Sequence, residues 1–201
     1  MKTRGPLVLA LATTFLTSPL SAQTASDDAT WSLDFQAGAA VPTSEIEGED
    51  VGTGFGFEAN VAYRIATHVS VYGGWDWHRF APDAVLGEPD VDLEETGYVV
   101  GLRFDHPFGA ETGHGPSYRL RAGVTLNHIE LEDSDGELID DSGHGAGFEV
   151  GAGLFMPLTD TWRIGPEVRF RALSRELDIG SGDVDVDLRY LAFDIVFSRS
   201  F

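Results

Sequence analysis

The stretch GFGFEANVAYRI, residues 54–65, decides the fold class. Its apolar side chains recur at every second position, from Phe55 to Ile65, and the positions between them carry glycine, Glu58 and Asn60. A repeat of two residues indicates a β-strand with one apolar and one polar face, whereas a helix repeats at about 3.6 residues. The stretch therefore predicts an amphipathic strand, close to the roughly ten residues that cross a membrane in a barrel.

Seven further segments show the same alternation, and with the first they make eight candidate strands. An even number is what a closed antiparallel barrel with both termini on one side requires. No segment after residue 22 approaches the roughly 18 consecutive apolar residues of a membrane-spanning helix. The sequence thus predicts an all-β fold, an eight-stranded antiparallel up-and-down transmembrane β-barrel. The seven segments are 31–41, 69–78, 97–105, 118–127, 148–156, 162–171 and 190–201.

The connections between these segments alternate between two kinds. Those after the second, fourth and sixth strands are 66–67, 106–116 and 158–161, and two of the three are short. Bacterial barrels have short periplasmic turns and longer outer loops. We therefore expect the other four connections, which are long and acidic, to face the cell exterior. They cover residues 42–53, 81–95, 130–144 and 174–187.

Residues 1–22 have the features of a cleaved secretory signal peptide. They begin with two basic residues, continue with an apolar run and end in small residues at Ala22. We expect cleavage after Ala22 and a barrel domain over residues 23–201, located in the cell outer membrane.

The composition excludes several classes of function. Without the leader the chain has 11 arginines, no lysine and 33 acidic residues, a net charge of −22. Such acidity argues against nucleic-acid binding, because phosphates need basic partners. The chain has no cysteine, so disulfides and thiolate metal sites are absent.

Charges on the polar strand faces are balanced, although the loops are almost entirely acidic. A soluble β-sandwich also alternates every two residues, but its solvated face has no need for such a balance. An enclosed lumen does, because an unpaired charge away from water is costly. We therefore expect a narrow interior filled by ion pairs. The expected lumen network is Asp34, Glu58, Arg64, Asp76, Arg103, Asp105, Arg119, Arg121, Glu149, Arg163, Glu167, Arg169, Arg171 and Asp194.

Aromatic residues on the apolar faces gather near the expected strand ends, where barrels place interfacial girdles. Ordinary β propensity explains aromatics within strands but not this position. The expected girdle residues are Trp31, Trp75, Trp77, Tyr98, Tyr118, Trp162 and Phe201.

Several of these segments together resemble a known group of proteins. Residues 54–64, VSVYGGW at 69–75, GPEVRFR at 165–171 and FDIVFSRSF at 193–201 are similar to strands of the outer-membrane β-barrel families that include opacity, surface-attachment and OmpA-like proteins. The resemblance covers essentially the whole chain after the leader. It implies a barrel without enzymatic activity. We also expect a monomer without cofactors, whose partners are outer-membrane lipid and lipopolysaccharide.

The resemblance also implies a role for the last strand. A terminal aromatic preceded by apolar residues at alternate positions is similar to the signal read by the barrel-assembly machinery. Phe193, Ile195, Phe197 and Phe201 match this pattern, while Arg199 stands where an apolar residue is usual.

The third acidic loop contains Asp135-Gly136, as calcium loops do, but an EF-hand register there puts Leu131 first and Ser142 twelfth, where carboxylates are required. A looser divalent-cation site remains as a hypothesis, with the fourth loop as a similar candidate. The third-loop candidates are Asp133, Asp135, Glu137, Asp140 and Asp141, and those of the fourth loop are Asp178, Asp183, Asp185 and Asp187.

Three functions follow from these patterns. The first is a structural or surface-interaction barrel that acts through its acidic loops, and the second is a narrow channel for small solutes. The third is a lipid-modifying enzyme, for which His78, His128, His144 and Ser142 are the candidate residues, and nothing in the sequence fixes a nucleophile and its base among them.

Overall fold

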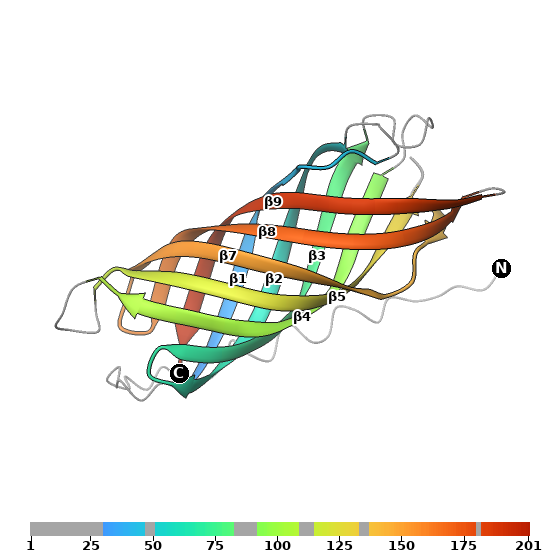
Figure 1. The fold of residues 1–201 in the computed structure, drawn as a ribbon. Coiled ribbons are helices and arrows are strands. Elements are labelled where there is room, and N and C mark those ends of the chain that lie inside the picture. Colours follow the sequence, from blue (N-terminus) through green and yellow to red (C-terminus); the bar gives the residue numbers. More distant parts are fainter. Residues whose placement is uncertain (1–29, 47–50, 83–91, 109–114, 133–136, 180–181) are drawn as a thin grey trace, which may run out of the picture.

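The computed structural model describes residues 30–46, 51–82, 92–108, 115–132, 137–179 and 182–201. Eight of its strands form one closed antiparallel barrel, in which each strand pairs with the next, β4 pairs with β5, and β9 pairs back with β1 (Figure 1). This confirms the predicted eight-stranded barrel. The strands are β1 (Trp31–Pro42), β2 (Val51–Ala66), β3 (Val69–Pro82), β4 (Asp92–Pro107), β5 (Ser117–Glu132), β6 (Leu138–Asp141), β7 (Gly145–Pro157), β8 (Trp162–Ile179) and β9 (Gly182–Ser200).

The short strand β6 is additional to the barrel and pairs with the far end of β5. None of the described residues forms a helix that is long and apolar enough to cross a membrane. The predicted signal peptide lies outside the described residues.

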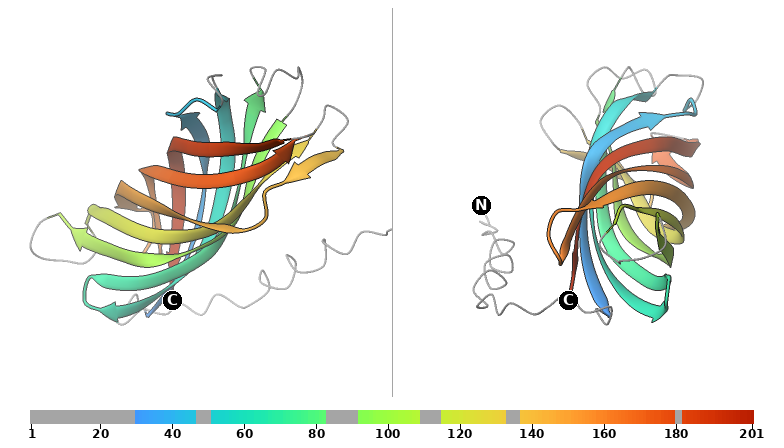
Figure 2. Two further views of the ribbon diagram at one scale, coloured as in Figure 1. Left: turned by 45° about the vertical axis from the view of Figure 1, so that its right-hand side comes forward. Right: turned by 90° about the vertical axis from the view of Figure 1, so that its left-hand side faces the viewer.

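The pairing register gives the barrel its narrow shape. Following paired residues once around the sheet from Trp31 leads back to β1 at Val41, ten residues further along. A stagger of ten residues over eight strands corresponds to a strand tilt of about 40°. The inclined strands are visible in both views of Figure 2. A barrel of this size has an interior just wide enough for side chains to fill.

The outward face of the barrel is an apolar band. Large apolar side chains there are extensively exposed, with 51% for Phe35, 58% for Val100 and 56% for Leu154. A continuous apolar surface of this extent marks contact with another apolar medium, here lipid. The soluble β-sandwich is therefore excluded, since the sheet closes on itself and its apolar side faces outward.

The band has a defined edge at the end of the barrel where the four long connections lie, which we call the loop end. Arg79, Glu94 and Glu130 occupy paired positions across β3, β4 and β5, so the outward face becomes charged there. Trp77, two residues below Arg79, donates a hydrogen bond from Nε1 to Glu94 at 2.9 Å. This tryptophan lies at the boundary between apolar and charged surface, as an interfacial aromatic does.

The opposite end, which we call the turn end, carries the short turns and the C-terminus (Figure 1). Trp31, Trp162 and Phe201 lie there on the outward face. The guanidinium of Arg199 lies 5.6 Å from the centre of the Trp162 ring, within the range of a cation–π contact. Arg199, the irregular residue of the terminal pattern, therefore has an aromatic partner at this interface.

The strands are longer at the loop end than the sequence analysis predicted. Segment 174–187 is mostly a β-hairpin, because β8 and β9 stay paired to Ile179 and Gly182. Segments 42–53, 81–95 and 130–144 likewise contain the ends of barrel strands, and the last also contains β6. The prediction of loops was wrong there because strand pairing continues beyond the lipid-facing band, where outward positions are no longer apolar. In β9, for example, the buried Val186 and Leu188 alternate with the exposed Asp187 and Arg189.

Candidate functional site: the barrel interior and its loop end

The barrel interior has three layers along its axis. An open vestibule lies at the turn end, a fully buried ionic layer occupies the middle, and an apolar layer fills the loop end. All three arise from inward positions of the same strands, because side chains alternate between the two faces of a sheet.

The ionic layer is built on Arg121 of β5 and on Arg169 and Arg171 of β8. These arginines contact six buried carboxylates on neighbouring strands, and all nine side chains are at most 3% exposed. The carboxylates belong to Glu58, Asp76, Glu95, Glu149, Glu167 and Asp194.

Glu58 is the central member of the ionic layer. Its carboxylate binds Arg121 at 2.6 Å, Arg171 at 2.8 Å and also Arg169. It accepts a further hydrogen bond from the side-chain amide of Asn60 at 2.5 Å. One carboxylate thus links guanidinium groups from two different strands, which fixes the positions of all three.

The ionic layer has six carboxyl groups and three arginines, so its acidic groups outnumber its basic ones. The sequence pattern predicts a balance of charge over the whole lumen and does not include Glu95, because residues 81–95 read as a loop. Glu95 accepts hydrogen bonds from Asn127 and Tyr190 and pairs with Arg171 at 3.2 Å. The continued alternation of β4 would have identified it.

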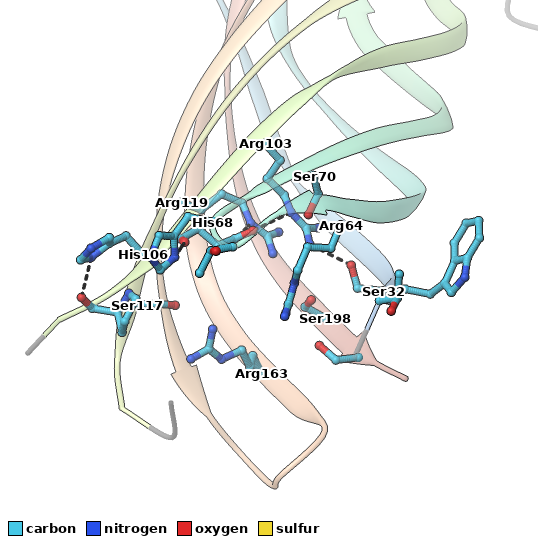
Figure 3. Close-up of a pocket in the computed structure, with 16 residues that line it drawn as sticks. Ser32, Arg64, His68, Ser70, Arg103, His106, Ser117, Arg119, Arg163 and Ser198 are labelled. Carbon is cyan, nitrogen blue, oxygen red and sulfur yellow. Dashed lines mark hydrogen bonds and ion pairs between the residues drawn. The ribbon is translucent and has the colours of Figure 1, made fainter. Parts of the chain in front are cut away.

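The vestibule contains the remaining members of the expected network. Arg103 pairs with Asp34 at 2.5 Å and with Asp105 at 2.7 Å, and Arg119 pairs with the same two carboxylates at 2.9 and 2.8 Å. Arg103, Asp105 and Arg119 line a cavity of about 430 Å³ that opens at the turn end, together with Arg64 and Arg163 (Figure 3).

Arg64 and Arg163 differ from the other arginines of the network. Arg64 is exposed at the mouth of the vestibule, outside the buried part of the network. Arg163 is half-buried and donates a hydrogen bond to the carbonyl oxygen of Gly115 at 3.0 Å. The wall of the vestibule therefore has four arginines and the carboxylate of Asp105, with serine hydroxyls between them, and the buried Asp34 pairs with Arg103 and Arg119 (Figure 3).

The apolar layer closes the interior at the loop end. Phe80, Leu93, Ile129 and Leu188 are four of its large apolar side chains, and none of the four is more than 1% exposed. Hydrophobic constrictions exclude water and therefore ions. In the described part of the barrel these side chains place an apolar barrier in the interior at this end, and the buried Arg175 lies beside it with its guanidinium bonded to backbone carbonyls of Asn127 and Gly145. Its members are Ala40, Ile46, Val51, Phe80, Leu93, Ile129, Leu131, Leu173, Val186, Leu188, Tyr190 and Ala192.

The expected assembly residues all lie on the lipid-facing side of β9 or just beyond it. Phe193, Ile195, Phe197 and Phe201 are between 42% and 59% exposed. Phe201 also closes the barrel, because its backbone N–H and carbonyl bond to Trp31 at 2.9 and 3.1 Å.

The loop residues proposed as cation ligands are spread over different surroundings. Asp133 and Asp135 lie outside the described residues, Glu137 is exposed, and Asp140 and Asp141 belong to β6. In the β8–β9 hairpin, Asp178, Asp183 and Asp185 take part in backbone pairing, and the exposed Asp187 lies 3.6 Å from Arg189.

The histidine and serine candidates do not form a catalytic pair in the described contacts. His128 and His144 stack with ring centres 4.5 Å apart, and His128 contacts Asp141 at 3.1 Å. The Ser142 hydroxyl accepts a hydrogen bond from the Ile129 N–H and donates to the Gly143 carbonyl. These contacts give Ser142 backbone partners, and a base that could activate it is not among them.

Comparison with known proteins agrees with this architecture. A family model described as outer membrane protein beta-barrel domain matches residues 8–201. Neisserial surface protein A (NspA) is similar in structure with a TM-score of 0.62 and 17% identity over 85% of this chain and 97% of that chain. The outer membrane protein OprG from Pseudomonas aeruginosa has a TM-score of 0.51 and 14% identity over 84% of this chain and 96% of that chain. A search of curated protein sequences finds no match.

Proposed function

Because the chain belongs to the outer membrane protein beta-barrel domain family and is located in the cell outer membrane, we propose that it has a structural or surface-interaction role there. The observation that carries this proposal is the closed interior. Ions would have to pass a buried ionic layer and then an apolar layer whose largest side chains are fully buried. A barrel closed in this way acts through the surface that it presents, with the loop end facing the exterior and the turn end facing the periplasm.

Conductance of the purified barrel in a planar bilayer tests the closed interior. We expect no steady single-channel steps, and an open porin reconstituted in the same way is the positive control. Steady steps from the wild-type barrel would contradict the proposal and favour the second candidate, a narrow channel for small solutes. Unaltered lipid A mass after overexpression is the expected result for a protein that is not a lipid-modifying enzyme.

The surface proposed for interaction is an acidic rim just above the apolar band. Arg79 is paired there with Glu94 at 2.8 Å and Glu132 at 3.8 Å, and it also contacts Asp92. With Glu130 on the adjacent strand, four carboxylates surround one arginine. Carboxylate oxygens are the ligands that calcium and magnesium prefer, so we expect the rim to meet the divalent cations that accompany lipopolysaccharide.

Calorimetric titration of the refolded barrel with calcium and with magnesium tests the rim. We expect binding that weakens in the double variant Glu130→Gln/Glu132→Gln. The matched control is Glu176→Gln, because Glu176 is an exposed acid of the β8–β9 hairpin outside the rim. Absence of heat in the wild type, or equal loss in the control, would remove the cations from the proposal.

A further inference from the structure

One cluster of the interior contains groups that the ion pairs do not satisfy. Asp76 and His78 of β3 and Glu95 of β4 lie together where the ionic layer meets the apolar layer, and their side chains are at most 1% exposed. The Nδ1 atom of His78 lies 3.7 Å from Asp76 Oδ2 and 3.6 Å from Glu95 Oε2. One ligand atom from each of the three lies within 4.8 Å of the others.

His78 is the anomaly in this cluster. Neither of its ring nitrogens has a hydrogen-bond partner, and the side-chain oxygen of Asn127, whose amide donates to Asp76, also lacks one. Buried polar groups are almost always bonded, so each exception calls for an explanation. A cation bound between His78 and the two carboxylates would explain the unbonded ring nitrogens and would also offset the surplus of carboxylates in the ionic layer.

The charges around the cluster do not cancel. Arg171 is the arginine that contacts both Asp76 and Glu95 among the described ion pairs, and it also binds Glu58 and Glu149. The whole ionic layer has six carboxylates and three arginines. Buried carboxylates in excess of their partners are strongly unfavourable unless a proton or a cation joins them.

We propose that Asp76, His78 and Glu95 bind one divalent transition-metal ion, with zinc as the best match. Imidazole nitrogen and carboxylate oxygen are both ligand types that zinc takes, and a zinc site can have three protein ligands. Donor atoms about 2.1 Å from a tetrahedral ion lie about 3.4 Å apart, close to the observed 3.6 and 3.7 Å. The ion would replace Arg171 and Asn127 at Asp76 Oδ2 and the Tyr190 hydroxyl at Glu95 Oε2. The Tyr190 hydroxyl, which donates to Glu95, lies beside the site as a fourth group.

The layers around the site decide how the metal enters. The apolar layer covers it toward the loop end, and Arg169, Arg171 and Glu58 lie toward the turn end. The ion therefore enters while the barrel folds and is retained afterwards. This behaviour distinguishes the site from exposed acidic groups, which exchange cations freely in the folded protein.

Metal analysis of the whole barrel tests the proposal. The protein is refolded either with zinc or with a chelator, then dialysed against chelator and analysed by elemental mass spectrometry. We expect about one zinc per chain after refolding with zinc, and none when zinc is added only after folding. A wild-type barrel that retains no metal after refolding with zinc would overturn the proposal and leave protons or water as the partners of His78.

Two variants and one control locate the site. We expect His78→Gln and Glu95→Gln each to lose the retained zinc, whereas His128→Gln keeps it, because His128 contacts Asp141 and Glu130 outside the interior. Retention by Glu95→Gln and His78→Gln, or loss in His128→Gln, would contradict the assignment. If His78→Gln does not fold, the cobalt-refolded wild type provides the second measurement. Visible absorption typical of a tetrahedral site with nitrogen and oxygen ligands is then expected, and an octahedral spectrum would overturn the site.

Discussion

Removal of Arg121 should destabilise the barrel far more than removal of a carboxylate beside it. The Arg121 guanidinium contacts Glu58, Glu149 and Glu167 and lies 4.3 Å from the centre of the Tyr72 ring. Breaking a buried ion pair by deleting one partner costs about 3–5 kcal/mol. Arg121→Met also widens the excess of carboxylates over arginines, so we expect a cost of about 5 kcal/mol.

Glu167→Gln is the matched substitution, because it removes a negative charge from the same contact from which Arg121→Met removes a positive one. Glu167 lies 3.2 Å from Arg121 and 4.0 Å from Arg169, and its second oxygen has no hydrogen-bond partner. The amide keeps an acceptor for Arg121 and removes one charge from an over-acidic layer. We therefore expect a change within about 1 kcal/mol, of either sign.

Equilibrium unfolding in urea, followed by tryptophan fluorescence in lipid vesicles, measures both variants. The informative quantity is the difference between them, because both act on the same contact. A Glu167→Gln cost equal to that of Arg121→Met would refute the reasoning from charge excess. A near-neutral Arg121→Met would refute the claim that the layer holds the strands together.

Three further predictions concern the seam, the lipid face and the last residue. A Cβ at Gly38 would overlap the backbone of β9, so Gly38→Ala should destabilise the closing seam by about 1–3 kcal/mol in the same urea assay, whereas Gly73→Ala, with its nearest atom at 3.5 Å, should be nearly neutral. Val124→Arg should cost about 2–4 kcal/mol by placing a charge in the lipid band, and Leu138→Arg on exposed β6 should not; equal costs would contradict the position of the band. Deletion of Phe201 should lower the folded fraction in heat-modifiability gels more than Phe201→Ala, which keeps the backbone bonds to β1; equal folded fractions would show that these bonds are dispensable.

Much of the barrel was predictable because lipid imposes a strict pattern on each strand. The alternation is imperfect, because several inward positions carry apolar side chains, among them Val99, Phe155 and Val196. Val99 points inward and packs with Ala62 and Tyr72. A Cβ at Gly101 or Gly123 would lie 2.6 or 2.5 Å from the Tyr72 hydroxyl, so glycine at these two positions leaves room for the tyrosine across the barrel.

The criterion of apolar residues on the outward face did not predict the strands at the loop end, because those parts of the strands are surrounded by water and not by lipid. A strand in lipid has apolar residues outside, whereas a strand in water has them inside. Val186, Leu188 and Tyr190 continue the inward parity of β9, with Asp187 and Arg189 between them. If every second residue is assigned to the inward face by position alone, whatever its polarity, the predicted strand becomes longer. The apolar layer then becomes visible in the sequence. Which carboxylates share an arginine depends on the barrel stagger, which the sequence patterns left open.

Both faces of the sheet change polarity at nearly the same level of β3. On the outward side the change falls between Trp77 and Arg79, and on the inward side between His78 and Phe80. Above this level the barrel has its own apolar core and a charged exterior, as a water-soluble barrel does. The paired strands there hold the acidic rim on a rigid support instead of on long loops. Binding to such a rim loses little conformational entropy, because its side chains stand on paired strands. A rim of this kind suits recognition of one specific partner better than adaptation to many different ones.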